Sequence, residues 1–175
     1  MPPMTNIARA YLFVPGNRPD RIVKALNSGA DAVIIDLEDA VAVAEKESAR
    51  EAVNAALQQT LPNNAALLLR INAVNTRWFN DDLTLMQLPA LHGVVVPKAE
   101  DPQALSTTAQ GLRGDQFILP LIETAVGMEQ SANIAHAKKV QRLLFGTIDF
   151  QVDLGIDGDA EELLAFRSHL VLHSK

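Results

Sequence analysis

The chain has 175 residues, of which 48% are hydrophobic and 21% charged, so it can bury one core, and its length is typical of a single domain spanning residues 1–175. Its net charge is -6, with 21 acids and 15 scattered Lys and Arg residues, which argues against a nucleic-acid partner because phosphate binding needs clustered cations. The absence of cysteine excludes disulfides, thiolate metal sites and thiol nucleophiles. No stretch approaches the roughly 20 apolar residues of a membrane span. We therefore expect a cytoplasmic protein without a membrane partner.

The first third of the chain contains two strand–turn–helix patterns. Tyr11–Val14 is a four-residue apolar run, and the turn Pro15–Asn17 and a proline at a typical helix start, Pro19, come after it. Ala32–Leu37 is a continuous run rich in Val and Ile, as in a strand that is covered on both faces. Glu45–Gln59 then has apolar residues at helical spacing. The pattern predicts a strand and a helix in each unit.

Four more rounds of this alternation follow without a linker or a low-complexity segment. The expected strands and helices are Leu67–Ile71 with Asp81–Gln87, Val94–Val96 with Pro102–Gln110, Phe117–Ile122 with Val126–Ala137, and Arg142–Phe145 with Glu161–His173. Such alternation predicts parallel strands joined by right-handed helical crossovers. A closed barrel of this kind has eight strands and typically ~250 residues. The pattern therefore leaves two alternatives, an open doubly wound sheet or the first six units of a barrel.

Charged side chains stand at or just after the ends of five of the expected strands. They are Glu38, Arg70, Lys98, Glu123 and Asp149. In a barrel or an open sheet of parallel strands, these ends lie on one face, and that face is where such folds build their active sites. The first turn has a single glycine, so the dinucleotide-binding fingerprint of open sheets is absent. The sequence therefore predicts an enzyme whose chemistry lies along this rim.

Seven motifs occur in the order that is typical of one family. They are Tyr11–Pro19, Gly29–Val41, Leu69–Asn72, Val95–Glu100, Leu121–Gly127, Phe145–Phe150 and Asp153–Gly155. From Arg9 onward the chain resembles the citrate lyase beta subunit and its relatives in the HpcH/HpaI aldolase superfamily. The resemblance implies a (β/α)8 TIM barrel, of which this chain holds about the first six units.

The resemblance also implies a magnesium site. Glu123 and Asp149 match the family's metal-binding glutamate after the fifth strand and aspartate after the sixth. Magnesium prefers hard oxygen ligands, keeps several waters and takes one or two protein carboxylates, so two acids at adjacent strand ends suit it. Taken alone, either acid could equally be a solvated loop carboxylate or a helix N-cap.

Arg70 and Glu38 are the residues to which the resemblance assigns the substrate. Arg70 would hold the carboxylate of a 2-oxo or 2-hydroxy acid in a bidentate pair. The alternative is an internal ion pair with Asp36, Glu38 or Asp39, and both arrangements can hold at once. Clustered acids of this kind should raise at least one pKa unless the metal or Arg70 compensates. We expect Glu38 to orient Arg70 and metal-bound water, and Asp39 to cap a turn.

Coenzyme A is the second expected ligand. Phe13, Arg18 and Lys24 match the family's positions for it, with the cations at the phosphates and the aromatic ring beside the adenine or pantetheine. The alternative for these residues is the exposed start of a helix. Lys98 would close the site through a salt bridge to a neighbouring acid, or would form a surface pair with Glu100.

The implied reaction is cleavage or formation of a carbon–carbon bond between an acetyl thioester and a 2-oxo acid, with magnesium as Lewis acid and Arg70 fixing the acid. Citryl-, citramalyl- and malyl-thioesters are the candidate substrates. In the family the base is an aspartate of a C-terminal segment, often from a neighbouring subunit, and this sequence contains no such segment. Two alternatives follow. The first is a lyase that acts in a longer chain or in a homo-oligomer, such as a trimer or hexamer. The second is a truncated non-catalytic homologue that keeps magnesium and 2-oxo acid binding or serves as an assembly partner.

Overall fold

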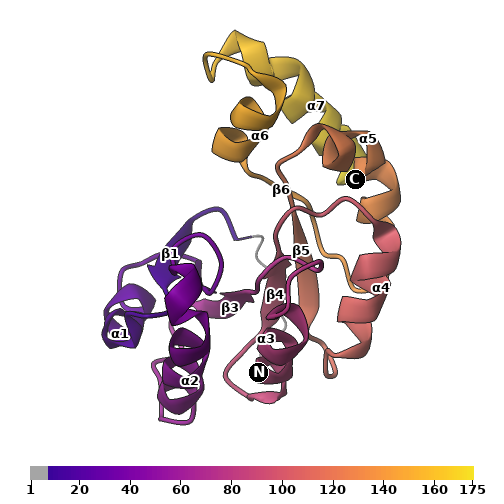
Figure 1. The fold of residues 1–175 in the computed structure, drawn as a ribbon. Coiled ribbons are helices and arrows are strands. Elements are labelled where there is room, and N and C mark those ends of the chain that lie inside the picture. Colours follow the sequence, from indigo (N-terminus) through magenta and orange to yellow (C-terminus); the bar gives the residue numbers. More distant parts are fainter. Residues whose placement is uncertain (1–7) are drawn as a thin grey trace.

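Six parallel strands in chain order form the centre of the protein, which is described by a computed structural model covering residues 8–175. Each strand pairs with the next one along the chain, and the sheet they form is curled (Figure 1). The strands are β1 (Tyr11–Pro15), β2 (Ala32–Asp36), β3 (Ala66–Arg70), β4 (Gly93–Val96), β5 (Phe117–Ile122) and β6 (Leu144–Phe145). A doubly wound sheet would reverse its strand order at a switch point. The partial TIM barrel is therefore confirmed, and the doubly wound alternative is wrong.

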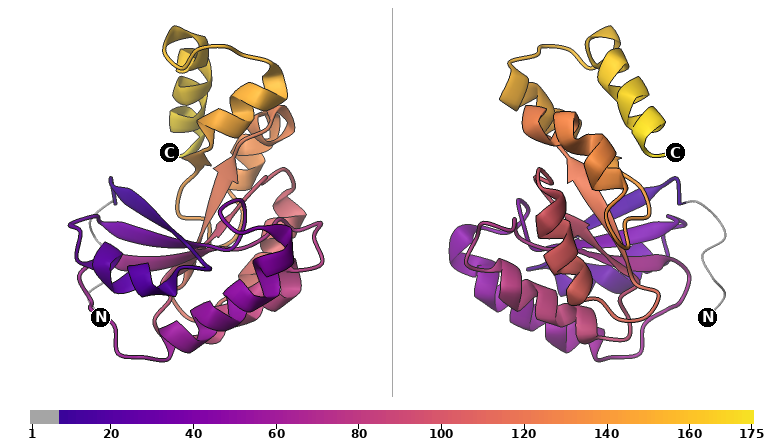
Figure 2. Two further views of the ribbon diagram at one scale, coloured as in Figure 1. Left: turned by 60° about the vertical axis from the view of Figure 1, so that its left-hand side comes forward. Right: turned by 90° about the vertical axis from the view of Figure 1, so that its right-hand side faces the viewer.

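Helical segments connect every pair of successive strands and lie along the outside of the curled sheet (Figure 2). They are η1 (Pro19–Arg21), α1 (Ile22–Leu26), η2 (Val43–Glu45), α2 (Lys46–Leu57), α3 (Phe79–Thr84), η3 (Leu85–Gln87), α4 (Pro102–Gln110) and α5 (Ala125–Ala135). Three more helical segments follow the last strand: α6 (Thr147–Leu154), η4 (Glu161–Leu163) and α7 (Leu164–His173). All the expected helices are present, and α6 is an additional one that the pattern did not predict. Within residues 8–175, no helix has the length and apolar character needed to cross a membrane.

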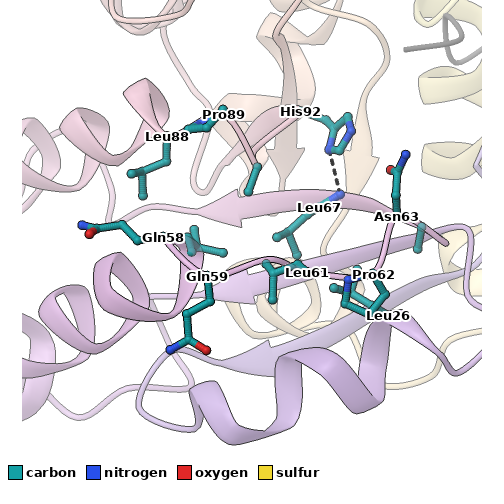
Figure 3. Close-up of a pocket in the computed structure, with 13 residues that line it drawn as sticks. Leu26, Gln58, Gln59, Leu61, Pro62, Asn63, Leu67, Leu88, Pro89 and His92 are labelled. Carbon is teal, nitrogen blue, oxygen red and sulfur yellow. Dashed lines mark hydrogen bonds between the residues drawn. The ribbon is translucent and has the colours of Figure 1, made fainter.

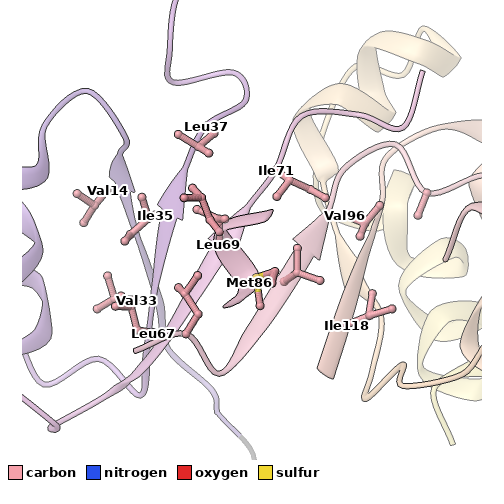
Figure 4. Close-up of a cluster of buried hydrophobic side chains, with 14 of the residues drawn as sticks. Val14, Val33, Ile35, Leu37, Leu67, Leu69, Ile71, Met86, Val96 and Ile118 are labelled. Carbon is pink, nitrogen blue, oxygen red and sulfur yellow. The ribbon is translucent and has the colours of Figure 1, made fainter. Parts of the chain in front are cut away.

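Hydrophobic side chains cover both faces of the sheet. On the outer face, strand residues such as Ile35 and Leu69 belong to one large cluster with helical residues such as Met86 of η3 (Figure 4). On the inner face, the alternate strand residues, among them Ile34 and Leu68, form a smaller cluster. Because both faces are covered, the central strands have the continuous apolar runs that predicted them.

The last strand is short, and aromatic packing anchors the segment that follows it. β6 pairs with the carboxyl end of β5 over two residues. The Phe150 ring of α6 stands edge-on to Phe145 of β6 at 5.0 Å and to Phe166 of α7 at 4.8 Å, an arrangement that aromatic rings favour. This packing fixes α6 beside the carboxyl end of the sheet. Within the described residues β1 and β6 are edge strands, and the expected homo-oligomer stays a prediction.

Candidate active site

The carboxyl ends of the strands bring together charged side chains that are almost completely buried. Arg70 ends β3 and is 9% exposed, Glu38 follows β2 and is 5% exposed, and Glu123 follows β5 and is 2% exposed. Charged residues are rarely buried to this degree without partners, because leaving water costs them much free energy. Their partners therefore define the site.

Asp36 is the principal partner of Arg70. The strand register places the two residues side by side at the ends of β2 and β3. Arg70 donates from Nε to Asp36 Oδ1 at 2.7 Å and from Nη2 to Oδ2 at 2.5 Å. The same carboxylate accepts the backbone N–H groups of Glu38 at 2.8 Å and Ala40 at 3.3 Å. Asp36 therefore fixes both the guanidinium and the loop that carries Glu38.

The ion pair with Asp36 occupies only one edge of the Arg70 guanidinium. A guanidinium has five N–H donors in a fixed fork, and the hydrogen bonds to Asp36 use Nε and Nη2. Nη1 lies 3.1 Å from Glu38 and 3.5 Å from Asp39, without a hydrogen bond within residues 8–175. The predicted internal ion pair is thus present, and the Nη1–Nη2 edge still has the geometry to take a second carboxylate. The substrate role of Arg70 stays a prediction.

Glu38 lies between two cations. Its Oε1 accepts from Lys98 Nζ at 3.2 Å, whereas its buried Oε2 has no hydrogen-bond partner among the described residues. Burial raises the pKa of Glu38 and outweighs the opposing attraction of Arg70 and Lys98, and the charge of Asp39 raises the pKa further. Glu38 is therefore a buried carboxyl group that pairs with Nη1 of Arg70 at 3.1 Å.

Lys98 connects Glu38 to Glu123. Its backbone N–H donates to Glu123 Oε1 at 2.7 Å while its side chain reaches Glu38. To do so, Lys98 adopts a φ of 46°, a left-handed conformation that is uncommon outside glycine and is found at functional sites. Of the two expected arrangements, the salt bridge to a site acid is the one present, and Glu100 instead accepts from Thr124 Oγ1 at 2.7 Å.

Glu123 is seated against the start of α6. A Cβ on Gly146 would lie 2.6 Å from Glu123 Oε2, so any other residue at position 146 would displace the carboxylate. Asp149 stands in the first turn of α6 and is half-buried. Asp153, one turn later on α6, accepts the backbone N–H of Ala125 at 2.8 Å. These contacts hold the loop after β5 and the start of α6 together.

The carboxyl groups of the rim carry more negative charge than their surroundings compensate. Burial raises the pKa of Glu123 to about 7, the charges of Glu38 and Asp149 contribute to the increase, and the Lys98 N–H opposes it. Within residues 8–175 no group of three or more His, Cys, Asp or Glu is arranged to hold a metal. Magnesium needs only one or two protein carboxylates. The hard oxygens of Glu123 and Asp149, in an anionic environment, fit that ion.

The raised pKa of Glu123 predicts a specific dependence of stability on pH. Because the folded state holds this proton more tightly than the unfolded state, the free energy of unfolding should fall as pH rises from about 4.5 through about 7. Glu123→Gln should remove that part of the slope. In metal-free buffer the variant should gain on the order of 3 kcal/mol relative to the unaltered chain between pH 5 and 8. Denaturant unfolding across this range measures it, and equal slopes for the two chains would contradict it.

The three residues expected to bind coenzyme A lie in the first β/α unit but do not form one cluster. The Phe13 ring, 44% exposed, lies 5.2 Å from the Arg70 guanidinium carbon. Arg18 pairs with Asp20 at 2.9 Å on the surface, and Lys24 is exposed on α1. The structure thus brings Phe13 to the carboxylate site, and the roles of all three residues toward coenzyme A stay predictions.

A separate hollow of about 600 Å³ opens at the opposite end of the strands (Figure 3). Its lining includes Leu67 near the start of β3 and His92 just before β4, and His92 Nδ1 accepts the Leu67 N–H at 3.1 Å. No acidic residue lines it. The hollow therefore does not contain the chemistry of the rim.

Two buried polar residues near the rim were not predicted from the sequence. Lys46, the first residue of α2, is 6% exposed. Asp82 of α3 accepts from Asn72 Nδ2 at 2.6 Å and from Arg50 Nη1 at 3.1 Å. A signal existed for Lys46, because a lysine at a helix start opposes the usual charge preference of that position. For Asp82 no local pattern distinguished it from its exposed neighbour Asp81.

Comparison with known proteins agrees with this geometry. Residues 9–175 match the model of the HpcH/HpaI aldolase/citrate lyase family. The chain belongs to this family. It is 37% identical to a citrate lyase subunit beta-like protein of Deinococcus radiodurans, across 97% of this chain and 62% of that protein. It is 32% identical to a (3S)-malyl-CoA thioesterase of Cereibacter sphaeroides, across 84% of this chain and 51% of the relative. The chain thus spans less than two thirds of the length of either relative.

Solved structures of family members have the same fold. A citrate lyase beta subunit from M. tuberculosis, complexed with oxaloacetate and magnesium, matches 93% of this chain and 72% of its own with a TM-score of 0.77 and 32% identity. The protein CitE from Mycobacterium tuberculosis, complexed with magnesium, acetoacetate and coenzyme A, matches 95% of this chain and 62% of its own with a TM-score of 0.78 and 31% identity.

Proposed function

We propose that the protein is a magnesium-dependent carbon–carbon lyase of the citrate lyase beta subunit type. It would cleave a 3-hydroxyacyl thioester, such as citryl-, citramalyl- or malyl-coenzyme A, into an acetyl thioester and a 2-oxo acid, or catalyse the reverse reaction. The observation that carries the proposal is the Nη1–Nη2 edge of the buried Arg70 guanidinium, which the hydrogen bonds to Asp36 leave open to a second carboxylate, on the same rim as the Glu123 and Asp149 carboxylates. A 2-oxo acid has the matching pair of groups, a carboxylate and an adjacent carbonyl.

Arg70 binds the carboxylate of the 2-oxo acid in this proposal. Its Nη1–Nη2 edge can form two parallel hydrogen bonds, and Asp36 holds the opposite edge so that the fork is oriented before the ligand arrives. Phe13 lies against the guanidinium and limits its motion from the open side. Preorganised donors of this kind stabilise developing charge without reorganising during the reaction.

Glu123 and Asp149 would hold the metal. When bound there, magnesium would supply Lewis-acid stabilisation of the hydroxyl-derived oxygen, which carries negative charge before the carbon–carbon bond breaks and becomes the carbonyl oxygen of the 2-oxo acid. Glu38 and Lys98 would position the residues that bind the ligands. Glu38 orients Arg70, and Lys98 holds Glu123 through its backbone N–H. To residues 8–175 we assign binding and orientation of the 2-oxo acid, and we assign no proton transfer to them.

The thioester half would extend over the first β/α unit. Arg18 and Lys24 are exposed cations there, and Phe13 offers an exposed ring beside Arg70. Phosphates and an adenine or pantetheine group are suited to those contacts. The complex of the related CitE with coenzyme A supports coenzyme A as the ligand, and the contacts of the three residues with it are part of this proposal.

Product analysis with the three candidate thioesters tests the function. Carbon–carbon cleavage should release acetyl-coenzyme A and a 2-oxo acid in the presence of magnesium, and Arg70→Lys should remove most of this turnover. Release of free coenzyme A with the intact hydroxy acid would instead indicate thioester hydrolysis, the activity named for the Cereibacter sphaeroides relative. Retained 2-oxo acid binding without turnover, in the chain alone and also in a longer chain that supplies a base, would contradict the lyase and favour a non-catalytic binding protein.

A further inference from the structure

Lys46 has an environment that helix preferences alone do not explain. It is the first residue of α2, where the positive end of the helix dipole disfavours a cation, and it is only 6% exposed. Burial lowers its pKa, as expected for an ammonium group removed from water. Because both the helix dipole and burial disfavour the charged ammonium group of Lys46, other contacts must stabilise it there.

The compensating contacts include two backbone carbonyls of the site loop, besides the Trp78 ring, whose centroid lies 5.8 Å from Lys46 Nζ. Lys46 Nζ donates to the carbonyl oxygen of Leu37 at 2.8 Å and to that of Glu38 at 2.7 Å. The Glu38 carbonyl also accepts the Val41 N–H at 3.0 Å. Lys46 therefore contacts the peptide groups on either side of the Glu38 Cα atom.

Asp36 holds the same loop by accepting hydrogen bonds from the backbone N–H groups of the loop. Its carboxylate accepts from the backbone of Glu38 and of Ala40 and also binds Arg70. The loop after β2 is thus fixed through its carbonyls by Lys46 and through its amides by Asp36. These contacts determine where the Glu38 side chain points, and it points to Arg70 and Lys98.

We propose that Lys46 is a positioning residue, which holds the Glu38 loop through its carbonyl groups and so keeps the Glu38 carboxyl group beside Nη1 of Arg70. The part of this proposal that concerns ligand affinity rests on the proposed function. The part that concerns the loop does not, because the contacts of Lys46 exist without a ligand.

Lys46→Met tests the proposal, and the chain offers a matched control. Lys139 also donates from Nζ to backbone carbonyls, at 3.0 Å to Gly114 and 3.4 Å to Arg113, in the loop before β5 at the opposite end of the strands. Lys139→Met removes the same kind of contact far from the rim. Should Lys46→Met fail to fold, Lys46→Gln, which keeps an N–H donor but is shorter, gives the same comparison.

Amide hydrogen exchange followed by NMR reads the loop directly. We expect Lys46→Met to accelerate exchange at Glu38, Ala40 and Val41 by about tenfold or more through local opening, and Lys139→Met to leave these amides unchanged. With magnesium present, Lys46→Met should weaken oxaloacetate binding about tenfold, as is typical when a residue supporting a site is removed, and Lys139→Met should not.

The outcomes separate the two proposals. A lower melting temperature for Lys46→Met with unchanged exchange at these amides would overturn the positioning role and leave Lys46 as a general stabilising residue. Faster exchange with unchanged oxaloacetate affinity would overturn the effect on the ligand. If the unaltered chain binds no 2-oxo acid, the proposed function fails, and the exchange rates alone still decide whether Lys46 positions the Glu38 loop.

Discussion

Replacing Arg70 with methionine should cost the folded state about 3–5 kcal/mol, because the Asp36 and Glu38 carboxylates would stay buried without their cation. Asp36 is 2% exposed and Glu38 5%, so solvent cannot replace the guanidinium. Denaturant unfolding measures the loss. Arg77→Met is the matched control, because the Arg77–Glu47 pair is 3.8 Å apart with side chains 72% and 67% exposed. It should change stability by no more than about 1 kcal/mol.

Arg70→Lys separates the structural role of Arg70 from its role in binding. The ammonium keeps the charge and should retain much of the stability that methionine loses. It cannot hold Asp36 and a ligand carboxylate on two edges at once, so the increase in melting temperature caused by oxaloacetate and magnesium should largely disappear. If Arg70→Lys keeps the full increase, Arg70 does not bind the carboxylate. If Arg70→Met and Arg77→Met have equal stability, the buried ion pair is not important for the fold.

Glu123→Gln and Asp149→Asn should each weaken magnesium binding by more than the roughly 10–100-fold typical of residues that only support a metal ligand. The reason is the loss of a charged oxygen from a site that has two protein carboxylates. Titration calorimetry measures the affinity. Glu129→Gln on α5 and Asp157→Asn after α6 remove the same charges from exposed positions and should leave the affinity unchanged.

Magnesium binding should also depend on pH. Glu123 must lose its proton to act as a ligand, and its pKa is raised to about 7, so the affinity should rise as pH increases from about 5.5 to 8. In Glu123→Gln this increase should be much smaller. Unchanged affinity in both Glu123→Gln and Asp149→Asn would exclude these residues as ligands.

The strands were predictable because their burial leaves a simple pattern. β2 and β5 are covered on both faces, and each produces a continuous apolar run in the sequence. β6 has only two residues, both half-buried, and the expected strand began two residues too early. α6 was missed because its apolar residues, Ile148, Phe150, Val152 and Leu154, recur every second position, which is not helical spacing. Only Phe150 of these is fully buried, so tertiary packing rather than the pattern determines the helix.

The position of the charged side chains at the strand ends was predictable, their contacts were less so, and their functional roles stay predictions. Placing Glu38, Arg70, Lys98, Glu123 and Asp149 on one rim requires only the alternation of strands and helices. The partner of Arg70 could not be chosen among Asp36, Glu38 and Asp39 from the sequence. That choice depends on the register of β2 against β3, which places Asp36 opposite Arg70. A lysine at a helix start was a signal that Lys46 is unusual, but its contacts with the Leu37 and Glu38 carbonyls depend on tertiary structure that no local pattern encodes.

The central claim is that Arg70 and the two carboxylates bind one ligand together with magnesium. Calorimetric titration of oxaloacetate into the chain, first with magnesium and then with the metal chelated, tests it most directly. The account predicts tight binding with magnesium and weak or undetectable binding without it, with the same loss in Glu123→Gln and in Arg70→Lys. Equal affinity with and without magnesium, unaffected by either substitution, would contradict it.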